Sequence, residues 1–198
     1  MAEPVRCWAS NDDAYNAYHD DEWGRPVTDE SSVLERLCLE GFQSGLSWLT
    51  ILRKRPAFRD AFAAFDPDTV ARFDGHDVER LLTNAAIVRH PGKIEAAIAN
   101  ARGTLELRER GTPLNELVWS YRPDDHRSPR SREEWQSTSP ESNALSKALK
   151  RVGFRFVGPT TVYSTMQACG VVNDHLVGCH VHDEVEREIA AAGLRSSH

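Results

Sequence analysis

The sequence is poor in cysteine and has no long apolar run. Its four cysteines, Cys7, Cys38, Cys169 and Cys179, are scattered over 198 residues, which is too few for a disulfide framework. No stretch approaches the roughly 20 apolar residues of a membrane-spanning helix, and no apolar signal sequence stands at the N-terminus. We therefore expect a cytoplasmic protein without a membrane partner, whose cysteines are buried or bind a metal.

Positive charge is also in short supply. The formal net charge is −6 and the sequence pI is about 5.8. This balance argues against strong non-specific binding to nucleic acids or acidic membranes, so any such binding has to come from local groups. Long polar tracts and internal repeats are missing as well, and the length predicts a single domain, 1–198, which we expect to be monomeric.

Alternating strand patterns are absent, whereas helical spacing recurs, so the sequence predicts an all-α fold. Residues 28–54 predict a helical hairpin, whose second helix should stop at Arg55-Pro56 because the residue before a proline avoids the α conformation. Residues 78–101 predict another pair of helices joined by a tight connection. Asp183–Ala192 predicts a C-terminal helix.

One carboxylate stands in the apolar first helix of the 28–54 hairpin. Glu40 falls at the edge of the apolar face, beside Leu37. A buried, isolated carboxylate is costly, so it should be paired, protonated or directed at a cavity whose ligand supplies hydrogen-bond donors. The alternative is a Glu at the margin of a solvated face. The helix break at Ser44-Gly45-Leu46, followed by the capping residue Ser47, favours the cavity.

Aromatic residues are dense around Glu40 in the sequence. Most aromatics at helical spacing belong to a core, but this set is large enough to line a flat-sided pocket. A carboxylate among indole and phenol rings suits a planar, electron-poor ring, which stacks on the aromatics and forms hydrogen bonds through its edge. A modified nucleobase fits that description. The residues concerned are Trp8, Tyr15, Tyr18, Trp23 and Trp48.

A candidate metal site involves both ends of the chain. The segment from His175 to Cys179 has the spacing of two ligands suited to zinc. Together with Cys7 and His19 it makes a Cys2His2 set, which is typical of a closed structural site and would tie the two ends together. Alternatives stay open at this point: Cys7 can be merely buried, and His180 or His182 can replace a ligand.

The connection within residues 78–101 is a candidate anion site. Its sequence is Arg89-His90-Pro91-Gly92-Lys93, and Gly92 exposes backbone at the start of a helix. Free amides and the helix dipole favour a phosphate there, and Arg89 and Lys93 add positive charge. A plain connection with solvated charges is the alternative.

Five motifs stand in one order along about residues 6–180. They are Tyr18-His19-Asp20-Asp21-Glu22-Trp23-Gly24, Cys38-Leu39-Glu40-Gly41 with Gly45-Leu46-Ser47-Trp48, Arg89-His90-Pro91-Gly92-Lys93-Ile94, Phe154-Arg155-Phe156-Val157-Gly158, and Met166-Gln167-Ala168-Cys169-Gly170 leading into Asn173-Asp174-His175. Together they resemble the bacterial DNA-3-methyladenine glycosylase I family. The resemblance implies a compact helix-hairpin-helix DNA glycosylase fold whose termini are joined by one structural zinc ion.

The resemblance also implies roles for individual residues. It implies that zinc is held by Cys7, His19, His175 and Cys179, and that Tyr18, Glu40 and Trp48 line the base pocket, where we place Trp8 and Tyr15 as neighbours. Glu40 is the expected catalytic residue, ionised and accepting hydrogen bonds from the amino edge of the base. The expected DNA contacts are a wedge of Gly45 and Leu46 and a backbone-binding hairpin with Arg89, Gly92 and Lys93.

The sequence departs from the family pattern at three places. Trp8 follows Cys7 without a spacer, so the path to zinc is expected to differ. Phe42 stands where glutamine or a small residue is expected, which should alter the contact with the opposite DNA strand. Residues 181–198 form a C-terminal extension.

We therefore predict a DNA repair enzyme of base excision, a monofunctional glycosylase. It would flip 3-methyladenine out of alkylated double-stranded DNA and hydrolyse its N-glycosidic bond, releasing free 3-methyladenine and leaving an abasic site. Two other classes remain at this stage. One is a non-catalytic reader of alkylated or distorted DNA on the same scaffold, and the other is a zinc-stabilised helical interaction protein without a DNA role.

Overall fold

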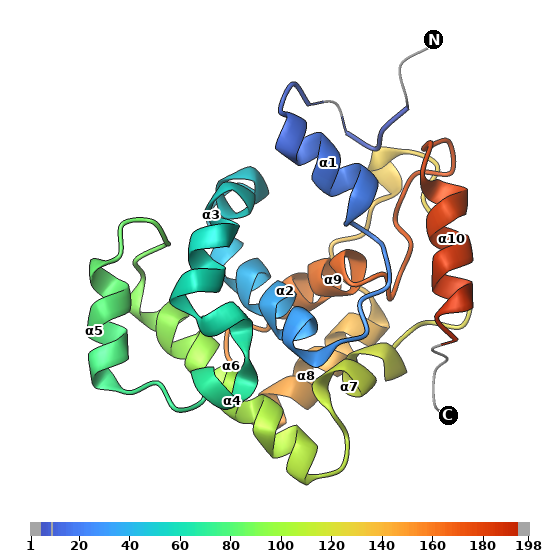
Figure 1. The fold of residues 1–198 in the computed structure, drawn as a ribbon. Helices are drawn as coiled ribbons and strands as arrows, with labels where there is room; N and C mark the ends of the chain where they lie inside the picture. Colours follow the sequence, from blue (N-terminus) through green and yellow to red (C-terminus); the bar gives the residue numbers. More distant parts are fainter. Residues whose placement is uncertain (1–4, 9, 194–198) are drawn as a thin grey trace.

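The computed structural model describes residues 5–8 and 10–193, and the regular elements in these residues are all helices (Figure 1). The all-α prediction is confirmed. None of the described helices is long and apolar enough to cross a membrane. In chain order the helices, with η marking the 3-10 type, are α1 (Asp13–Asp21), α2 (Glu30–Gln43), α3 (Trp48–Ala61), η1 (Ala63–Phe65), α4 (Pro67–Val70), α5 (Gly75–Thr83), α6 (Pro91–Glu109), α7 (Leu114–Ser120), η2 (Arg132–Glu134), α8 (Pro140–Arg151), α9 (Pro159–Ala168) and α10 (His182–Ala191).

Helix α2 lies at the centre of the fold and packs against α3, α6, α7 and α9 (Figure 1). Asp29 caps its N-terminus by accepting hydrogen bonds from the backbone N–H groups of Ser31 and Ser32. Its apolar side chains, among them Leu34 and Leu37, belong to the main core. A side chain near the end of α2 therefore starts from a backbone that the core holds on several sides.

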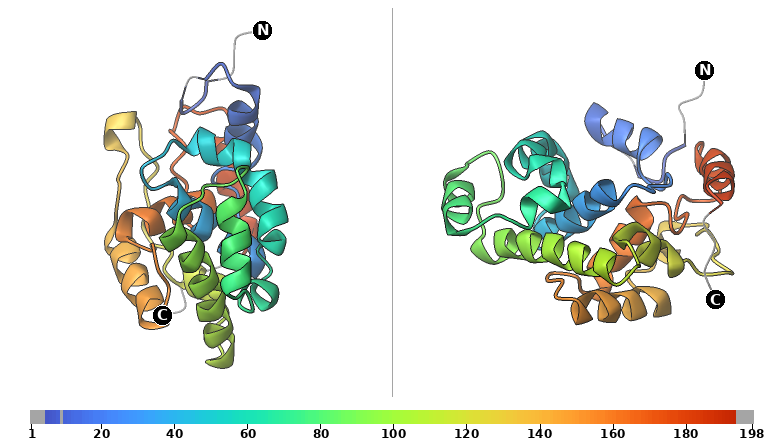
Figure 2. Two further views of the ribbon diagram at one scale, coloured as in Figure 1. Left: turned by 90° about the vertical axis from the view of Figure 1, so that its left-hand side faces the viewer. Right: turned by 60° about the horizontal axis from the view of Figure 1, so that its bottom comes forward.

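A second, smaller apolar cluster joins the two ends of the chain. Val185 and Ile189 of α10 pack there with Tyr18 of α1 and Leu52 of α3, so α10 lies on the same side of the molecule as the N-terminal segment (Figure 2). The predicted C-terminal helix is confirmed. Residues 194–198 of the predicted extension lie outside the described residues, and the single-domain organisation stays a prediction.

The predicted end of a helix at Arg55-Pro56 is wrong, because α3 continues through Pro56 to Ala61. A proline inside a helix removes one backbone hydrogen bond and costs about 3 kcal/mol. Tertiary contacts offset that cost here. The Arg55 guanidinium is bound by both carboxylate oxygens of Glu22 at 2.6 Å, and Phe58 is fully buried in the main core.

Candidate active site and metal centre

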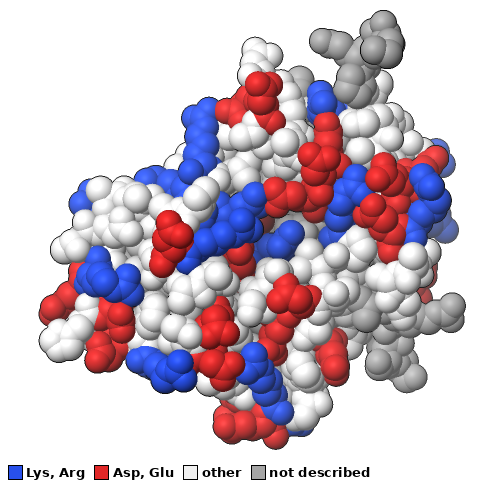
Figure 3. Space-filling view, viewed as in Figure 1, with Lys and Arg blue, Asp and Glu red and all other residues white. Residues whose placement is uncertain are grey.

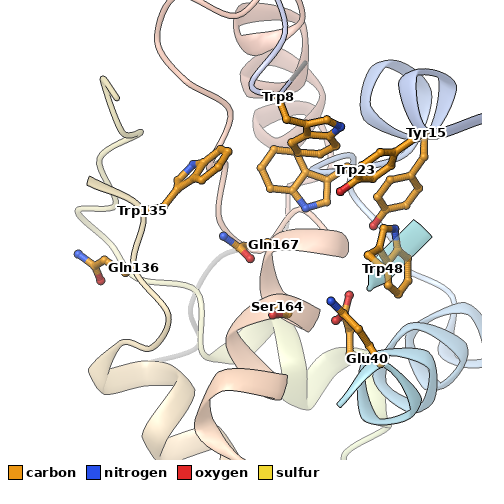
Figure 4. A pocket seen from close by; sticks show the side chains of 11 residues that line it. Trp8, Tyr15, Trp23, Glu40, Trp48, Trp135, Gln136, Ser164 and Gln167 are labelled. Carbon is orange, nitrogen blue, oxygen red and sulfur yellow. The ribbon is translucent and has the colours of Figure 1, made fainter. Parts of the chain in front are cut away.

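A cavity of about 310 Å³ opens between α1, α2, α3 and α9 and the segment around Trp135. We call it the aromatic cavity. Figure 4 shows the indole and phenol rings above it and Glu40 below, approaching from α2. Its volume suits a small planar ligand. The lining residues are Trp8, Tyr15, Tyr18, Trp23, Glu40, Gln43, Trp48, Trp135, Gln136, Ser164 and Gln167.

Glu40 is a titratable residue of the cavity without a hydrogen-bond partner. Its side chain is buried, and it forms no hydrogen bond or ion pair with the described residues. Burial raises the pKa of Glu40 from its ordinary value of 4.5 to about 8. Without a ligand the neutral acid is therefore favoured at pH 7, and the expectation that Glu40 is ionised opposite the bound base stays a prediction.

Glu35 on the same helix is a buried carboxylate that has a hydrogen-bond partner. It is buried to a similar degree as Glu40, but both of its oxygens accept from Arg59 Nε at 2.9 and 3.0 Å. Buried polar groups in proteins are nearly always satisfied in this way. Of these two buried carboxylates of α2, Glu40 is the one without a partner among the described residues, which leaves its carboxyl group available to a ligand.

Aromatic rings form the walls of the cavity on the side of α1 and α3. The Tyr18 and Trp48 rings lie 5.2 Å apart at an angle of 45°, and the Trp8 and Tyr15 rings are stacked at 5.2 Å. The pKa of Tyr18 is raised, first by burial and then by the nearby Glu40 charge. The indole N–H groups of Trp8 and Trp48 are buried without a partner among the described residues. All five residues that we expected in the base pocket line this cavity, namely Trp8, Tyr15, Tyr18, Glu40 and Trp48.

The four expected metal ligands also meet. The ligand atoms of Cys7, His19, His175 and Cys179 lie within 4.8 Å of one another, and all four residues are buried. We call them the Cys2His2 cluster. Sulfur-to-nitrogen distances are 3.4 Å for Cys7 to His175, 3.5 Å for Cys179 to His19 and 3.6 Å for Cys179 to His175. A tetrahedral zinc ion with Zn–S of about 2.3 Å and Zn–N of about 2.0 Å holds S and N ligands about 3.5 Å apart.

The outer groups of the cluster point to a metal as well. His19 Nδ1 lies 2.7 Å from Asp20 Oδ1, and His175 Nε2 donates to the Trp23 carbonyl at 2.8 Å. Such bonds fix the tautomer and orientation of metal-binding imidazoles. The backbone N–H of Leu176 also donates to the Cys7 sulfur at 3.3 Å. The missing spacer between Cys7 and Trp8 does not keep Cys7 out of the cluster.

The residues expected to touch DNA lie at two loops. Gly45 and Leu46 stand between α2 and α3, where Gly45 has a φ of +82° and Leu46 is 42% exposed. The connection between the packed helices α5 and α6 confirms the predicted helix pair. There Arg89 is exposed, and the His90 side chain caps α6 by accepting from the Lys93 N–H at 3.3 Å.

The structure corrects the role expected for Lys93. Lys93 is buried, and its ammonium group donates to the carbonyls of Phe42 and Ser44 at 2.9 and 2.5 Å. Its charge therefore stabilises the C-terminal end of α2 instead of lying free for a phosphate. Phe42 is fully buried and its ring lies 4.6 Å from that of Phe58, and its expected effect on the contact with the opposite strand stays a prediction.

Several cavity residues were not predicted from the sequence. Trp135 comes from the polar, proline-bearing stretch 122–137, in which a lone tryptophan is the one signal that could have identified it. Gln167 belongs to a motif of the family resemblance, but neither its spacing nor its chemistry indicated a role. The remaining unpredicted residues are Gln43, Gln136 and Ser164.

Comparisons with known proteins agree with this geometry. The profile of the methyladenine glycosylase family matches residues 8–182. A relative named DNA-3-methyladenine glycosylase 1, from Escherichia coli, is 52% identical over 178 residues, which cover 88% of this chain and 95% of the relative. A DNA-3-methyladenine glycosylase from Haemophilus influenzae is 41% identical over 179 residues, covering 88% of this chain and 96% of that protein.

Solved structures show the same fold. A crystal structure of 3-methyladenine DNA glycosylase I superimposes with a TM-score of 0.86 at 49% identity, covering 90% of this chain and all of that one. The enzyme from Staphylococcus aureus, whose structure describes 3-methyladenine recognition, superimposes with a TM-score of 0.85 at 35% identity, covering 89% and 95% of the two chains.

Proposed function

The chain belongs to the methyladenine glycosylase family, and we propose that it removes 3-methyladenine from alkylated duplex DNA by hydrolysing the N-glycosidic bond. The observation that carries this proposal is Glu40, a carboxyl group without a partner at the base of an aromatic cavity. The curated relatives are glycosylases, which favours excision over the non-catalytic reader and over the zinc-stabilised interaction protein.

The chemistry follows from the leaving group. Alkylation at N3 makes the base cationic, so the glycosidic bond breaks with little acid catalysis. Flipping a nucleotide out of a duplex costs a few kcal/mol, and less for a damaged base. Stacking on aromatic side chains returns about 1–3 kcal/mol per base. The Tyr18 and Trp48 rings supply one stacking wall, and Trp8 and Tyr15 close the cavity beside them.

Glu40 contributes electrostatic selectivity. A cationic base opposite the carboxyl group favours its ionised form, because the attraction between opposite charges is strong where water is excluded. Since burial holds the pKa of Glu40 near 8, binding of the cationic lesion releases a proton below that pH. Neutral adenine brings no charge and leaves Glu40 protonated. Glu40 thus discriminates by charge as well as by hydrogen bonds.

DNA contacts are proposed at two neighbouring loops. Acidic and basic side chains are interspersed on the face seen in Figure 3, which is in line with the net charge of −6, so binding has to rest on local groups. Leu46 is the exposed apolar wedge next to α2. The Gly92 amide at the start of α6 and the exposed Arg89 are the phosphate-binding groups.

Zinc is the metal we propose for the Cys2His2 cluster. Two thiolates and two imidazoles at tetrahedral separations are the preferred ligands of zinc, and a fourth protein ligand leaves no open position for water. When bound, zinc links Cys7 near the start of the chain to Cys179 near its end and has a structural role. We further propose that the protein is cytoplasmic, because the cluster needs the reduced thiols of that compartment. We also propose that it is a monomer.

Release of free base from methylated duplex DNA tests the function. Wild-type protein should release 3-methyladenine, detected by chromatography, and Glu40→Gln should slow single-turnover release by roughly 100-fold. Glu35→Gln is the matched control, since it alters a buried carboxylate of the same helix that Arg59 already binds. Absence of released base from wild-type protein would contradict the proposed function, and equal rates for Glu40→Gln and wild type would remove Glu40 from the reaction.

A further inference from the structure

The wall of the aromatic cavity opposite Trp48 is held by a polar network. Its centre is Asp174, which is 3% exposed. Asp174 Oδ2 accepts hydrogen bonds from Gln167 Nε2 at 2.7 Å and from the Tyr163 hydroxyl at 2.9 Å. Its Oδ1 lies 3.0 Å from His126 Nε2. The Asp174 carbonyl also accepts from the Trp135 indole N–H at 2.9 Å. One buried residue therefore anchors two side chains of this wall.

The network determines which end of the Gln167 amide faces the cavity. Each oxygen of Asp174 faces a donor, the Tyr163 hydroxyl at Oδ2 and His126 Nε2 at Oδ1. The group of Gln167 that lies 2.7 Å from Oδ2 is therefore its NH2, since its carbonyl oxygen would place acceptor against acceptor there. The Gln167 carbonyl oxygen is then the atom left for a ligand. Figure 4 shows Gln167 projecting from α9 into the space between Trp135 and Glu40.

We propose that Gln167 is a specificity-determining residue whose carbonyl oxygen, together with Glu40, accepts hydrogen bonds from the 6-amino group of the flipped base, and that Asp174 is the positioning residue that fixes this orientation. The inference rests on the proposed function and names the chemical feature that the site selects. An amino group offers two N–H donors, one for each acceptor. A 6-carbonyl group places its oxygen against the Gln167 oxygen and leaves that acceptor unpaired, which costs binding free energy.

The other amides of the cavity lack such a constraint. Gln43 lines the cavity but forms no side-chain hydrogen bond with the described residues, so its amide can rotate to offer either a donor or an acceptor. It therefore cannot distinguish an amino group from a carbonyl group. This difference makes Gln43→Met the matched control for Gln167→Met.

The test compares two bases that differ at position 6. Excision of 3-methyladenine from methylated duplex DNA is measured alongside 3-methylguanine, and binding of the two free bases is measured by calorimetry. Gln167→Met should reduce the preference for 3-methyladenine by roughly tenfold, the equivalent of about 1.4 kcal/mol. Gln43→Met should keep the wild-type preference. An unchanged preference in Gln167→Met overturns the inference while wild-type excision of 3-methyladenine upholds the proposed function, whereas no excision by wild type overturns the function itself.

Asp174→Asn tests the positioning role. His126 Nε2 donates to the Asn173 carbonyl at 3.1 Å as well as to Asp174, so the introduced amide should turn its oxygen to His126 and its NH2 to Gln167. Gln167 must then rotate and present its own NH2 to the cavity, which favours a 6-carbonyl base. The expected result is a reversal toward 3-methylguanine without loss of zinc. Tyr163→Phe removes the other donor to the same carboxylate oxygen and should keep the wild-type preference. Retention of that preference in Asp174→Asn would overturn the positioning role.

Discussion

The Cys2His2 cluster and the aromatic cavity both bury polar groups in an all-helical protein. They differ in whether those groups have hydrogen-bond partners. In the cluster, each imidazole has an outer partner, Asp20 for His19 and the Trp23 carbonyl for His175. In the cavity, Glu40 and the Trp48 indole N–H have none among the described residues. Satisfied buried groups stabilise a fold, whereas unsatisfied ones cost free energy until a ligand arrives. The cluster is therefore a stability element and the cavity a binding site.

The two regions nevertheless touch. The Trp8 ring stacks on Tyr15 in the cavity and meets the His19 ring edge-on at 4.6 Å. Damage to the cluster should therefore reach the cavity through Trp8, whereas a change at Glu40 should leave the cluster intact. The predictions below test this asymmetry, from the largest expected effect to the smallest.

Removing a metal ligand should have the largest effect. Cys179→Ala should lose the metal and lower the free energy of unfolding by several kcal/mol, because metal binding is coupled to folding. Metal analysis and thermal denaturation with and without a chelator measure this. Cys169→Ala, which alters a buried cysteine outside the cluster, should keep its metal. If Cys179→Ala melts at the wild-type temperature, the cluster does not stabilise the fold.

Glu40→Gln should separate stability from function. The folded-state pKa of Glu40 is about 8 against an ordinary 4.5, so wild type loses stability relative to the variant as the pH rises from about 4.5 to 8. Above pH 8 the variant should be more stable by a few kcal/mol, since each pKa unit corresponds to about 1.4 kcal/mol, while excision falls. Denaturant unfolding at pH 5 and pH 8.5 measures the difference. If the variant is destabilised equally at both pH values, Glu40 is a structural residue whose buried charge does not reduce stability.

Lys93→Met should lower stability, as a change in the cluster does, because the ammonium group of Lys93 donates to two carbonyls. The variant leaves the end of α2 without these bonds and should lose about 1–3 kcal/mol of stability. The slope of log affinity for duplex DNA against log salt concentration should stay that of wild type. A slope reduced by about one would mean that Lys93 neutralises a phosphate after all.

Arg25→Ala should have the smallest effect. Arg25 forms ion pairs with Glu184 and Glu188 of α10, and these pairs are partly exposed, so they contribute less than about 1 kcal/mol. The melting temperature should fall slightly, with metal content and excision unchanged. Loss of metal from this variant would contradict the small effect and would show that the bonds from Arg25 to the Asp20 carbonyl, next to His19, support the cluster.

Sequence reasoning succeeded where local chemistry decides the outcome. Helical spacing and capping residues predicted the helices around Glu40, and the spacing of His175 and Cys179 predicted a metal site whose ligands do meet. It failed where partners distant in sequence decide. Pro56 stays inside a helix because Glu22 holds Arg55.

The same reason explains the misplaced Lys93 and the unpredicted wall of the cavity. Lys93 reaches back to the end of α2, which is 49 residues away at Ser44. Asp174 connects Trp135, 39 residues earlier, to Gln167 on α9. No local pattern encodes such contacts, since each depends on helices that pack only in the finished fold.

The position of the cluster also determines the order in which contacts can form during synthesis of the protein. Cys7 meets His175 across 168 residues, so the N-terminal segment leaves the ribosome long before its partners exist. At a synthesis rate of about 5–20 residues per second, Trp8, Tyr15 and Tyr18 are made roughly 10–30 s before the distant segment that fixes them. Because distant pairings form last and slowly, the aromatic cavity is completed only after the segment from His175 to Cys179 has been synthesised. A truncated chain ending before His175 would therefore carry every stacking ring of the α1 side and still lack a working site.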